Sequence, residues 1–430
     1  MKTAVHILFQ LLAIAGFCQR PQVRFSHLGT DQGLSQSNVL CILQDSRGFM
    51  WFGTRDGLNK YDGYTFTVYK NSPEDSTTLS NNFVTSIIED RKGGFWIGTW
   101  GGGLDYFNPE KQRFTHFKRD PHHNDNASGA FINVLMQDDQ GKIWIGTDGG
   151  GLKVFDPGTG KFTNYMNDSR DPWSLSDNEV TCMLMDSRHQ VWVGTTRGGL
   201  NLLDSAHNRF IHLQHDEKDG RSLSSNYVWK LFEDSHKNIW VATRGAGLNL
   251  MDQSQRTFRH FNHDPHNSNS LAHDVVFSLA EDDRENLWIG TENGGLSVLH
   301  LPTGAFYTYQ HDDIDPASLS NNSIYSLYKD AQNNMWVGTY SGGANLYNKN
   351  ANLFMHYVHS TDPDGLGHNN ILHFCGGAGG LVWIATDGGG VDLFDPNKST
   401  FKHFTHHPGD PNSICGNYIL NVYKLSLIHI

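Results

Sequence analysis

The sequence predicts an all-β protein, a β-propeller of four-stranded antiparallel blades. Tryptophan recurs at intervals of 45 to 48 residues over most of the chain, and each of these tryptophans is followed three residues later by threonine. A period of this length is typical of propellers and other repeat architectures. The eight tryptophans of this lattice are Trp51, Trp96, Trp144, Trp192, Trp240, Trp288, Trp336 and Trp383.

A single repeat indicates which architecture this is. The third repeat contains four β-rich runs, at residues 132–137, 143–147, 152–155 and 162–165, and they are separated by the turn sequences DDQG, DGGG and DPGTGK. Short runs rich in Val, Ile and aromatic residues between Gly, Asp and Pro turns predict consecutive antiparallel hairpins. No helical periodicity appears. Four short strands in one period therefore predict one propeller blade.

The repeated residues have structural explanations. A tryptophan on the second strand would pack between adjacent blades, and the glycine that follows it in most copies would let neighbouring sheets approach closely. An aspartate stands six residues before seven of the eight lattice tryptophans, where it would cap its own turn, whereas the eighth copy has Gly377. Many links between repeats carry Leu-Ser-x-Asn, which we interpret as loop packing and turn chemistry.

The ends of the repeat array predict how the ring closes. Residues 24–28 (RFSHL) resemble the fourth-strand runs at 113–117 and 209–213 but precede the first repeat, so we expect them to complete the last blade and hide its edge. This favours a seven-bladed propeller over residues 20–350, with residues 351–424 beginning a second propeller and an aberrant tail at 425–430. The alternative is one eight-bladed ring that holds every copy.

The start of the chain and its charge predict the compartment and exclude some partners. Residues 1–19 have the layout of a secretory signal peptide, with an uncleaved anchor as the alternative. The net charge of −12 argues against nucleic acid or an anionic membrane surface as the main partner. No other segment is long and apolar enough to span a membrane, so membrane contact is expected only through segments beyond this chain.

The cysteines and histidines predict no metal, no cofactor and no redox centre. Cys41 and Cys182 occupy equivalent positions and are interpreted as buried small hydrophobes rather than as a disulfide. Histidine is abundant, at 24 residues, but recurs at one fourth-strand position in separate blades, too far apart to share an ion. No H-E-x-x-H, G-x-S-x-G or Walker motif is present, and no catalytic residue is predicted.

Candidate ligand-binding residues come from the turn between the second and third strands, which lies on the same face as the links between blades. The position four residues after each lattice tryptophan varies within a repeated frame, as a recognition surface requires and as an unconstrained surface also allows. Aromatic rings there would stack on sugars, and arginines would pair with uronate or sulfate groups. The candidates from this turn are Arg55, Trp100, Asp148, Arg197, Arg244, Glu292 and Tyr340, with Asp387 in the eighth copy. Trp173 and Trp229, which lie off the tryptophan lattice, are added as aromatic residues expected near the same face.

The combined pattern "LSxxxV…D…G…WIGTxGGGLxxFDPxxxxF" closely resembles the two-component regulator propeller repeat, from Phe25 to about Lys424. The resemblance implies the periplasmic sensor region of a Bacteroidetes hybrid two-component system histidine kinase, anchored in the inner membrane. Such proteins carry two seven-bladed propellers, a β-sandwich, a membrane helix, a kinase core and a receiver. They sense oligosaccharides released from glycans and switch on polysaccharide-utilisation genes.

This sequence departs from that pattern because it contains no kinase, ATP-binding or receiver motif. The chain itself is therefore expected to bind an oligosaccharide without catalysis, as the N-terminal part of a longer protein, and the full-length protein is expected to be a homodimer. The alternatives are a secreted propeller enzyme, either a glycosidase or a lyase, and a protein-binding scaffold. An enzyme would need carboxylates that converge at the ring centre, and Asp148, Glu292 and Asp387 lie in separate repeats.

Overall fold

The computed structural model describes residues 23–117, 131–349, 357–359 and 365–425. The predicted signal peptide lies outside these residues. The chain forms two compact units, residues 1–350 and residues 351–430, which are described separately. Among the described residues there is no helix long and apolar enough to cross a membrane.

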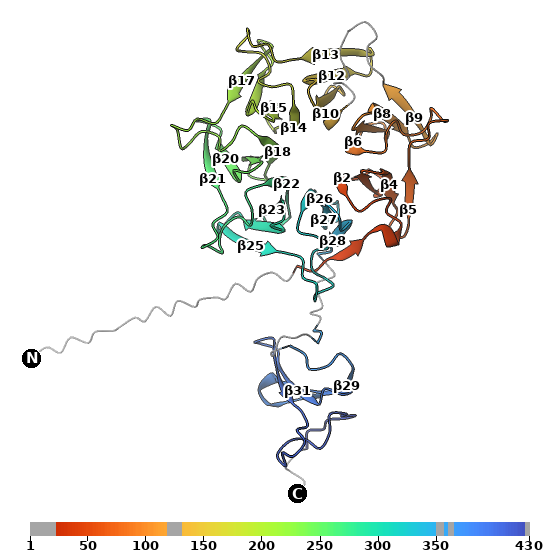
Figure 1. Cartoon of the computed structure of the whole chain (residues 1–430), viewed down its shortest axis with the longest axis vertical. Helices are drawn as coiled ribbons and strands as arrows, with labels where there is room; N and C mark the ends of the chain where they lie inside the picture. Colours follow the sequence, from red (N-terminus) through yellow and green to blue (C-terminus); the bar gives the residue numbers. More distant parts are fainter. Residues whose placement is uncertain (1–22, 118–130, 350–356, 360–364, 426–430) are drawn as a thin grey trace, which may run out of the picture. The chain divides into compact units, whose positions relative to one another are not determined.

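The first unit is a ring of seven four-stranded antiparallel sheets (Figure 1). Blade 1 contains β2 (Val39–Gln44), β3 (Met50–Thr54), β4 (Gly57–Tyr61) and β5 (Phe66–Tyr69). Blade 2 contains β6 (Val84–Glu89), β7 (Phe95–Thr99), β8 (Gly103–Asn108) and β9 (Arg113–Phe117). Blade 3 contains β10 (Ile132–Gln137), β11 (Ile143–Thr147), β12 (Leu152–Asp156) and β13 (Lys161–Tyr165).

Blades 4 to 7 repeat this order. Blade 4 contains β14 (Val180–Met185), β15 (Val191–Thr195), β16 (Leu200–Asp204) and β17 (Arg209–Leu213). Blade 5 contains β18 (Val228–Glu233), β19 (Ile239–Thr243), β20 (Leu248–Asp252) and β21 (Thr257–Phe261). Blade 6 contains β22 (Val276–Glu281), β23 (Asn286–Thr291), β24 (Leu296–His300) and β25 (Ala305–Tyr309). Blade 7 contains β26 (Ile324–Lys329), β27 (Met335–Thr339), β28 (Ala344–Tyr347) and the N-terminal β1 (Ser26–Leu28).

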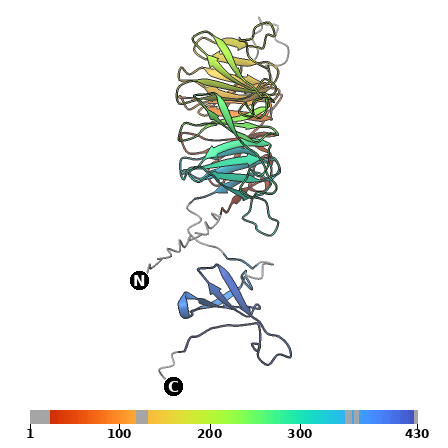
Figure 2. The same cartoon turned by 90° about the vertical axis from the view of Figure 1, so that its left-hand side faces the viewer.

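The first strand of each blade is the innermost, and the fourth forms the outer rim (Figure 1). Figure 2 shows the ring from its edge. Because strands alternate in direction, each blade presents the start of its inner strand and its second-to-third turn at one end of the ring. The turns between the first and second strands lie at the opposite end.

The N-terminal strand β1 closes the ring. It pairs antiparallel with β28, with Ser26 opposite Leu346 and Leu28 opposite Ala344. The seventh blade is thus built from both ends of the unit, which removes the exposed edges of an open array. The all-β propeller with seven blades, and one more blade outside the ring, is confirmed; the eight-bladed alternative is not what forms.

The second unit contains one blade of β29 (Ile371–Gly376), β30 (Val382–Thr386), β31 (Val391–Asp395) and β32 (Thr400–Phe404). A short 3-10 turn at Ala378–Gly380 stands where the other repeats have their aspartate turn. Phe374 and Tyr423 of this unit are exposed. That this blade begins a second propeller remains a prediction.

The lattice tryptophans of the ring form the contacts between blades. All seven are buried. Trp51 is 1% exposed, and its ring lies 4.6 Å from that of Phe95 and 5.9 Å from that of Phe107, both in blade 2. Burial of such rings between blades contributes to the stability of the ring.

The repeated glycine allows this packing. A Cβ atom on Gly53 would lie 2.4 Å from Sγ of Cys41 and 2.8 Å from Cγ1 of Val84 in the next blade. Both distances are far below van der Waals contact, so a larger residue would push the first two blades apart.

The links between blades are held by side chains of the blade they enter. The backbone N–H of Ser176 donates to Oδ1 of Asn201 on the third strand at 3.0 Å, and Ser224 donates to Asn249 in the same way. Before this point the link passes over the outer strand: Phe210 N–H donates to the carbonyl of Trp173 at 2.8 Å. The Leu-Ser sequence therefore positions the chain for its return to the inner strand.

Candidate functional site

Three positions in every blade meet where the inner strand begins. They are the residue just before the inner strand, the second residue of that strand, and the residue four after the lattice tryptophan. The third position is tied to the first by the backbone: Trp100 N–H donates to the carbonyl of Phe83 at 2.8 Å, and Arg244 N–H donates to Tyr227 at 3.0 Å. The same bond recurs in blades 3, 4, 6 and 7.

The second residue of the inner strand is a β-bulge in every blade. In blade 5 the pairing of β18 with β19 skips Trp229, because Val228 is opposite Thr243 and Lys230 is opposite Ala242. A bulged residue leaves the regular alternation of the strand and re-aims its side chain. The bulged residues of blades 5, 6 and 7 are all aromatic: Trp229, Phe277 and Tyr325.

These positions assemble two rows of rings that Arg55 joins, and we call the whole set the aromatic arc. It consists of Tyr227, Trp229, Phe277, Tyr325, Tyr340, Phe83, Trp100 and Phe131, with Arg55 and Arg244 among them. The ring centroids lie 5.3 Å apart for Trp229 and Phe277, 4.8 Å for Phe277 and Tyr325, and 5.7 Å for Tyr325 and Tyr340. On the other side of Arg55, Phe83 lies 6.1 Å from Trp100, and Trp100 lies 5.1 Å from Phe131.

Arg55 joins the two halves of the arc. Its guanidinium carbon lies 5.6 Å from the ring of Tyr340 in blade 7 and 5.5 Å from that of Phe83 in blade 2. These are cation–π distances. Because Arg55 makes no ion pair among the described residues, its N–H groups remain available to an anionic group.

Arg244 ends the arc in blade 5. Its guanidinium lies 5.5 Å from the rings of both Tyr227 and Trp229, and its Nη1 donates to the Tyr227 hydroxyl at 3.2 Å. This hydrogen bond, reinforced by the charge of Glu292, raises the pKa of Arg244 above its ordinary value. Burial chiefly raises the pKa of Tyr325, and Glu292 adds to the shift. Glu292 is thus the acidic neighbour of the arc.

The arc covers six blades and stops at blade 4. The equivalent positions of blade 4 hold Glu179, Thr181 and Thr196. Thr181 instead donates through its hydroxyl to the carbonyl of Val228 in the next blade. This end of the ring is therefore asymmetric, with aromatic rings on blades 5, 6, 7, 2 and 3, the guanidinium of Arg55 on blade 1, and a small polar segment on blade 4.

The structure brings together Arg55, Trp100, Trp229, Arg244 and Tyr340, with Glu292 beside them, and it places the other candidates elsewhere. Asp148 follows the arc in blade 3, where its backbone N–H donates to Phe131 at 2.9 Å. Arg197 lies in the polar segment, with its backbone N–H bound to Asp177. Trp173 lies on the outer rim, 4.5 Å from the guanidinium of Arg209, and Asp387 belongs to the second unit.

Five residues of the arc were missed by sequence reasoning: Phe83, Phe131, Tyr227, Phe277 and Tyr325. The available signal was position within the repeat, because each stands either just before or just after the Val or Ile that begins the inner strand of every blade. When the residues at these two positions are compared across all the repeats, many are aromatic. One repeat taken alone does not show this.

The arrangement offers binding surfaces. Flat rings present faces for the C–H faces of sugar rings or other planar groups, and guanidinium groups present paired donors for carboxylate or sulfate oxygens. No group of three or more His, Cys, Asp or Glu side chains within the described ranges is arranged to hold a metal ion.

Comparison with known proteins identifies the repeats. The sequence profile described as "Two component regulator propeller" matches seven segments, at residues 33–56, 78–101, 126–149, 174–197, 222–245, 270–293 and 318–341. The chain belongs to the two-component regulator propeller family. Each matched segment ends within a few residues of the position that supplies Arg55, Trp100 or Tyr340.

Solved structures with this fold include extracellular regions of sensor proteins. The chain is similar to the extracellular domain of the hybrid two-component system BT3049 from B. thetaiotaomicron, with a TM-score of 0.75 and 28% identity, over 93% of this chain and 50% of that one. The extracellular domain of BT4673 from the same organism shares the fold, with a TM-score of 0.62 and 22% identity, over 92% of this chain and 55% of that one.

Another relative is much longer than this chain. "Histidine kinase P4" from Formosa agariphila is 53% identical over 74 residues, which are 17% of this chain and 5% of that protein. The chain therefore spans about half of these two extracellular domains and 5% of the histidine kinase. It is homologous to extracellular sensor domains of hybrid two-component systems.

Proposed function

We propose that this two-component regulator propeller is the periplasmic ligand-sensing region of a hybrid histidine kinase and that it binds glycan-derived oligosaccharides to control polysaccharide-utilisation genes. The observation that carries the proposal is the aromatic arc on a fold whose relatives include extracellular domains of hybrid two-component systems. Binding by this chain would need no catalysis, since the signal would pass to kinase domains elsewhere in the full-length protein.

The arc fits a saccharide because it combines rings with charged donors. Tyr340 is 45% exposed, so its face is open to a ligand. Arg55 and Arg244 are exposed and stand at either end of the Tyr340–Trp229 segment. A chain of two or three sugars laid along this segment would stack on rings and direct an acid group to a guanidinium.

A panel of oligosaccharides tests the proposal. The purified chain is heated with each member, and the melting temperature and the integrity of the sugar are both measured. A ligand that binds only the folded state raises the melting temperature in proportion to its occupancy. A shift with intact sugar supports the sensor, cleavage products indicate a glycosidase or lyase, and no effect with any member favours a protein-binding scaffold.

Localisation and assembly belong to the same proposal. The relatives are extracellular domains, which supports export of this chain, and we propose the periplasm as its compartment. We propose in addition that the full-length protein is a homodimer anchored in the inner membrane. Cell fractionation and analytical ultracentrifugation of the detergent-extracted full-length protein test these two points.

A further inference from the structure

Blade 1 has a shorter turn between its second and third strands than the other blades of the ring. The leucine of β4 follows Trp51 by seven residues, whereas the equivalent residue follows its tryptophan by eight in each of the other six ring blades. Thr54 pairs directly with Gly57, so only Arg55 and Asp56 form the turn. Within the described ranges, Arg55 lacks the backbone bond that ties this position to the inner strand in the other blades. The short turn therefore presents Arg55 differently from its equivalents.

The carboxylate next to Arg55 in the chain is committed to other partners. Asp56 forms an ion pair with Lys70 at 2.5 Å and accepts a hydrogen bond from the side-chain amide of Asn82 at 3.1 Å. Lys70 follows β5, and Asn82 belongs to the link that leads into blade 2. The side chain of Arg55 itself forms neither an ion pair nor a hydrogen bond with any residue that the structure describes.

Two aromatic rings from neighbouring blades hold the guanidinium of Arg55. Its carbon lies 5.6 Å from the ring of Tyr340 in blade 7 and 5.5 Å from the ring of Phe83 in blade 2. The side chain is nevertheless exposed. A planar guanidinium placed by such contacts offers paired donors in a fixed fork, which matches the oxygens of a carboxylate or a sulfate and needs little further ordering on binding.

The charges of the arc leave Arg55 as the cation in excess. The hydrogen bond with Tyr227, and then the charge of Glu292, raise the pKa of Arg244, so Arg244 has an acidic neighbour. Burial raises the pKa of Tyr325, and among the charges that oppose this shift Arg55 acts more strongly than Arg244. The positive charge of Arg55 is therefore felt at the Tyr325 hydroxyl, which has no hydrogen-bond partner among the described residues.

The other acidic residues at the three arc positions lie on distant blades. They are Asp148 on blade 3 and Glu179 on blade 4, two and three blades away from Arg55. The rings of Phe83 and Trp100 on blade 2, 6.1 Å apart, stand between blade 1 and these acids. An anionic group bound at Arg55 would therefore have aromatic rings, and not carboxylates, beside it on both neighbouring blades.

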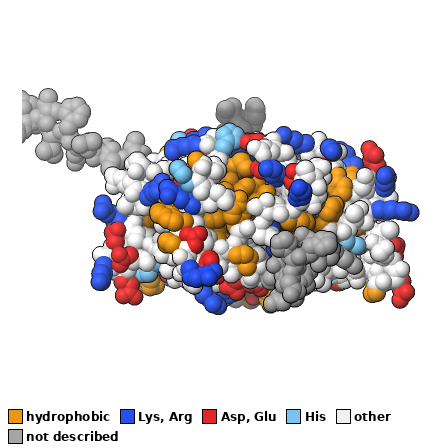
Figure 3. All heavy atoms as spheres, turned by 90° about the horizontal axis from the view of Figure 1, so that it is seen from above, with side chains coloured by type: hydrophobic (Ala, Val, Ile, Leu, Met, Phe, Trp, Pro, Cys, Tyr) orange, Lys and Arg blue, Asp and Glu red, His pale blue; other side chains and the backbone are white. Residues whose placement is uncertain are grey.

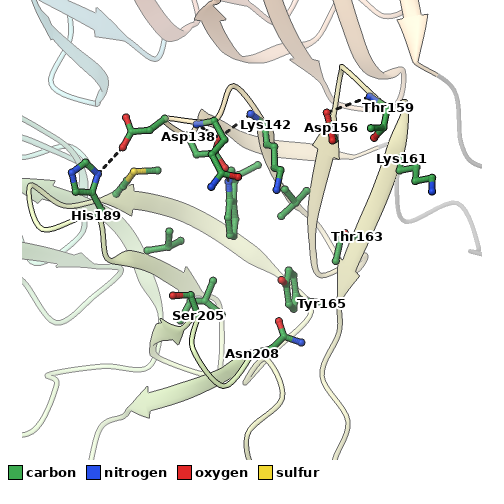
Figure 4. A pocket seen from close by; sticks show the side chains of 17 residues that line it. Asp138, Lys142, Asp156, Thr159, Lys161, Thr163, Tyr165, His189, Ser205 and Asn208 are labelled. Atoms are coloured by element: carbon green, nitrogen blue, oxygen red, sulfur yellow. Dashed lines mark hydrogen bonds and ion pairs between the residues drawn. The ribbon is translucent and has the colours of Figure 1, made fainter.

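A groove of about 610 Å³ between blades 3 and 4, at the opposite end of the ring, does not suit an anionic ligand (Figure 4). The charge of Lys142 already acts on Asp156, and Figure 4 shows Lys161 pointing away from Lys142. Figure 3 shows side chains of both charge signs on this side of the ring. The charged residues that line the groove are Asp138, Asp139, Asp156, Lys142, Lys161 and His189.

We propose that the aromatic arc is selective for acidic oligosaccharides and that Arg55 binds the acid group, carried either as the carboxylate of a uronate or as a sulfate ester. This inference rests on the function proposed above and adds the chemical class of the ligand. The acid group accepts hydrogen bonds from the edge of the Arg55 guanidinium, and the neighbouring sugar lies against the exposed ring of Tyr340. Arg244, which already has Glu292 beside it, is not the anchor.

The test is calorimetric titration of the purified chain with two matched pairs of ligands. One pair is a uronate trisaccharide and its uncharged methyl ester, and the other is a sulfated trisaccharide and its unsulfated parent. At least one acidic member should bind about tenfold or more tightly than its uncharged counterpart, the effect of one charged hydrogen-bonded contact. Which pair shows the preference identifies the carrier of the acid group.

Two arginine variants locate the preference. Arg55→Gln should weaken the acidic ligand by about tenfold or more and leave its uncharged counterpart unchanged. Arg197→Gln is the matched control: Arg197 is an exposed arginine at the same end of the ring but outside the arc, and its loss should leave both affinities unchanged. Both replaced side chains are exposed, so both variants should fold, as melting curves verify.

The outcomes separate this inference from the function on which it rests. Equal affinity for the charged and uncharged members of both pairs, an Arg55→Gln variant that keeps the preference, or an equal loss in Arg197→Gln would overturn the role of Arg55. Binding of only neutral members of the wider oligosaccharide panel would do the same, and in each of these cases the sensor function would stand. Absence of binding by every sugar would overturn both.

Discussion

The indole N–H of Trp192 donates a 2.9 Å hydrogen bond to Oδ2 of Asp186, six residues earlier in the chain. Oδ1 of the same carboxylate accepts the backbone N–H groups of Arg188 and Gln190. One side chain thus closes the turn between the first two strands and fixes the ring that packs between blades. The indole bond recurs at Trp51, Trp144, Trp240, Trp288 and Trp336.

Replacement of this carboxylate should destabilise the ring. Asp186→Ala leaves a buried indole N–H and two backbone N–H groups without partners, and we expect a loss of about 3 kcal/mol in the free energy of unfolding. In blade 2 the equivalent Asp90 accepts the Tyr106 hydroxyl rather than the indole, so Asp90→Ala should cost less. Urea denaturation of both variants measures the difference, and equal losses would contradict this role of the indole bond.

The buried thiols should be inert in the folded chain. Burial raises the pKa of both Cys41 and Cys182 to about 12, so almost no thiolate exists at pH 8. Cys415 is exposed. Timed labelling with a thiol reagent should therefore modify Cys415 quickly and Cys41 and Cys182 only after denaturant is added. Rapid labelling of either buried thiol in the native chain would mean that blades 1 and 4 open locally.

Blade 2 departs from the repeat in a way that makes stability depend on pH. Asp105 stands where blades 1, 4, 5 and 7 have asparagine, and it is fully buried, with Oδ1 2.7 Å from Nδ1 of His116. Burial raises the pKa of this carboxyl above its usual 3.8. An acid whose folded pKa is raised binds more protons in the folded state, so it lowers stability as pH rises from its ordinary pKa through the raised one.

Asp105→Asn removes this dependence. The variant should gain stability relative to the parent as pH rises across that window, because only the parent has to ionise a buried carboxyl. Thermal melts of both chains at pH 4 and pH 7 check the sign. A difference in melting temperature that stays constant or shrinks between the two pH values would contradict the assignment.

Much of the framework could be predicted from the sequence because it repeats. The spacing of Trp51 and its equivalents predicts the blade, and the likeness of residues 24–28 to other fourth strands indicates the pairing with β28. The bond from Asp186 to Trp192 was not predicted, because a turn cap needs only backbone partners and nothing in the spacing requires the indole to turn toward it.

The binding surface could be predicted only in part. Arg55, Arg244 and Tyr340 could be predicted because each occupies the variable position four residues after a lattice tryptophan. Phe277 and Tyr325 depend on the β-bulge, which breaks the simple alternation of inward and outward side chains. Trp173 is grouped with these residues because its link lies on the same face as the second-to-third turn. The bond from Phe210 N–H to the carbonyl of Trp173 instead holds this residue on the outer rim.

Two equally exposed aromatic residues give the most direct test of the arc as the ligand surface. Tyr340 in the arc is 45% exposed and Trp173 on the rim is 47% exposed, so truncation of either removes a similar open ring with little effect on folding. The affinity of the oligosaccharide with the largest melting shift is measured for Tyr340→Ala and Trp173→Ala. The account predicts a loss of about tenfold or more for Tyr340→Ala and no change for Trp173→Ala; unchanged affinity in the first, or an equal loss in the second, would contradict it.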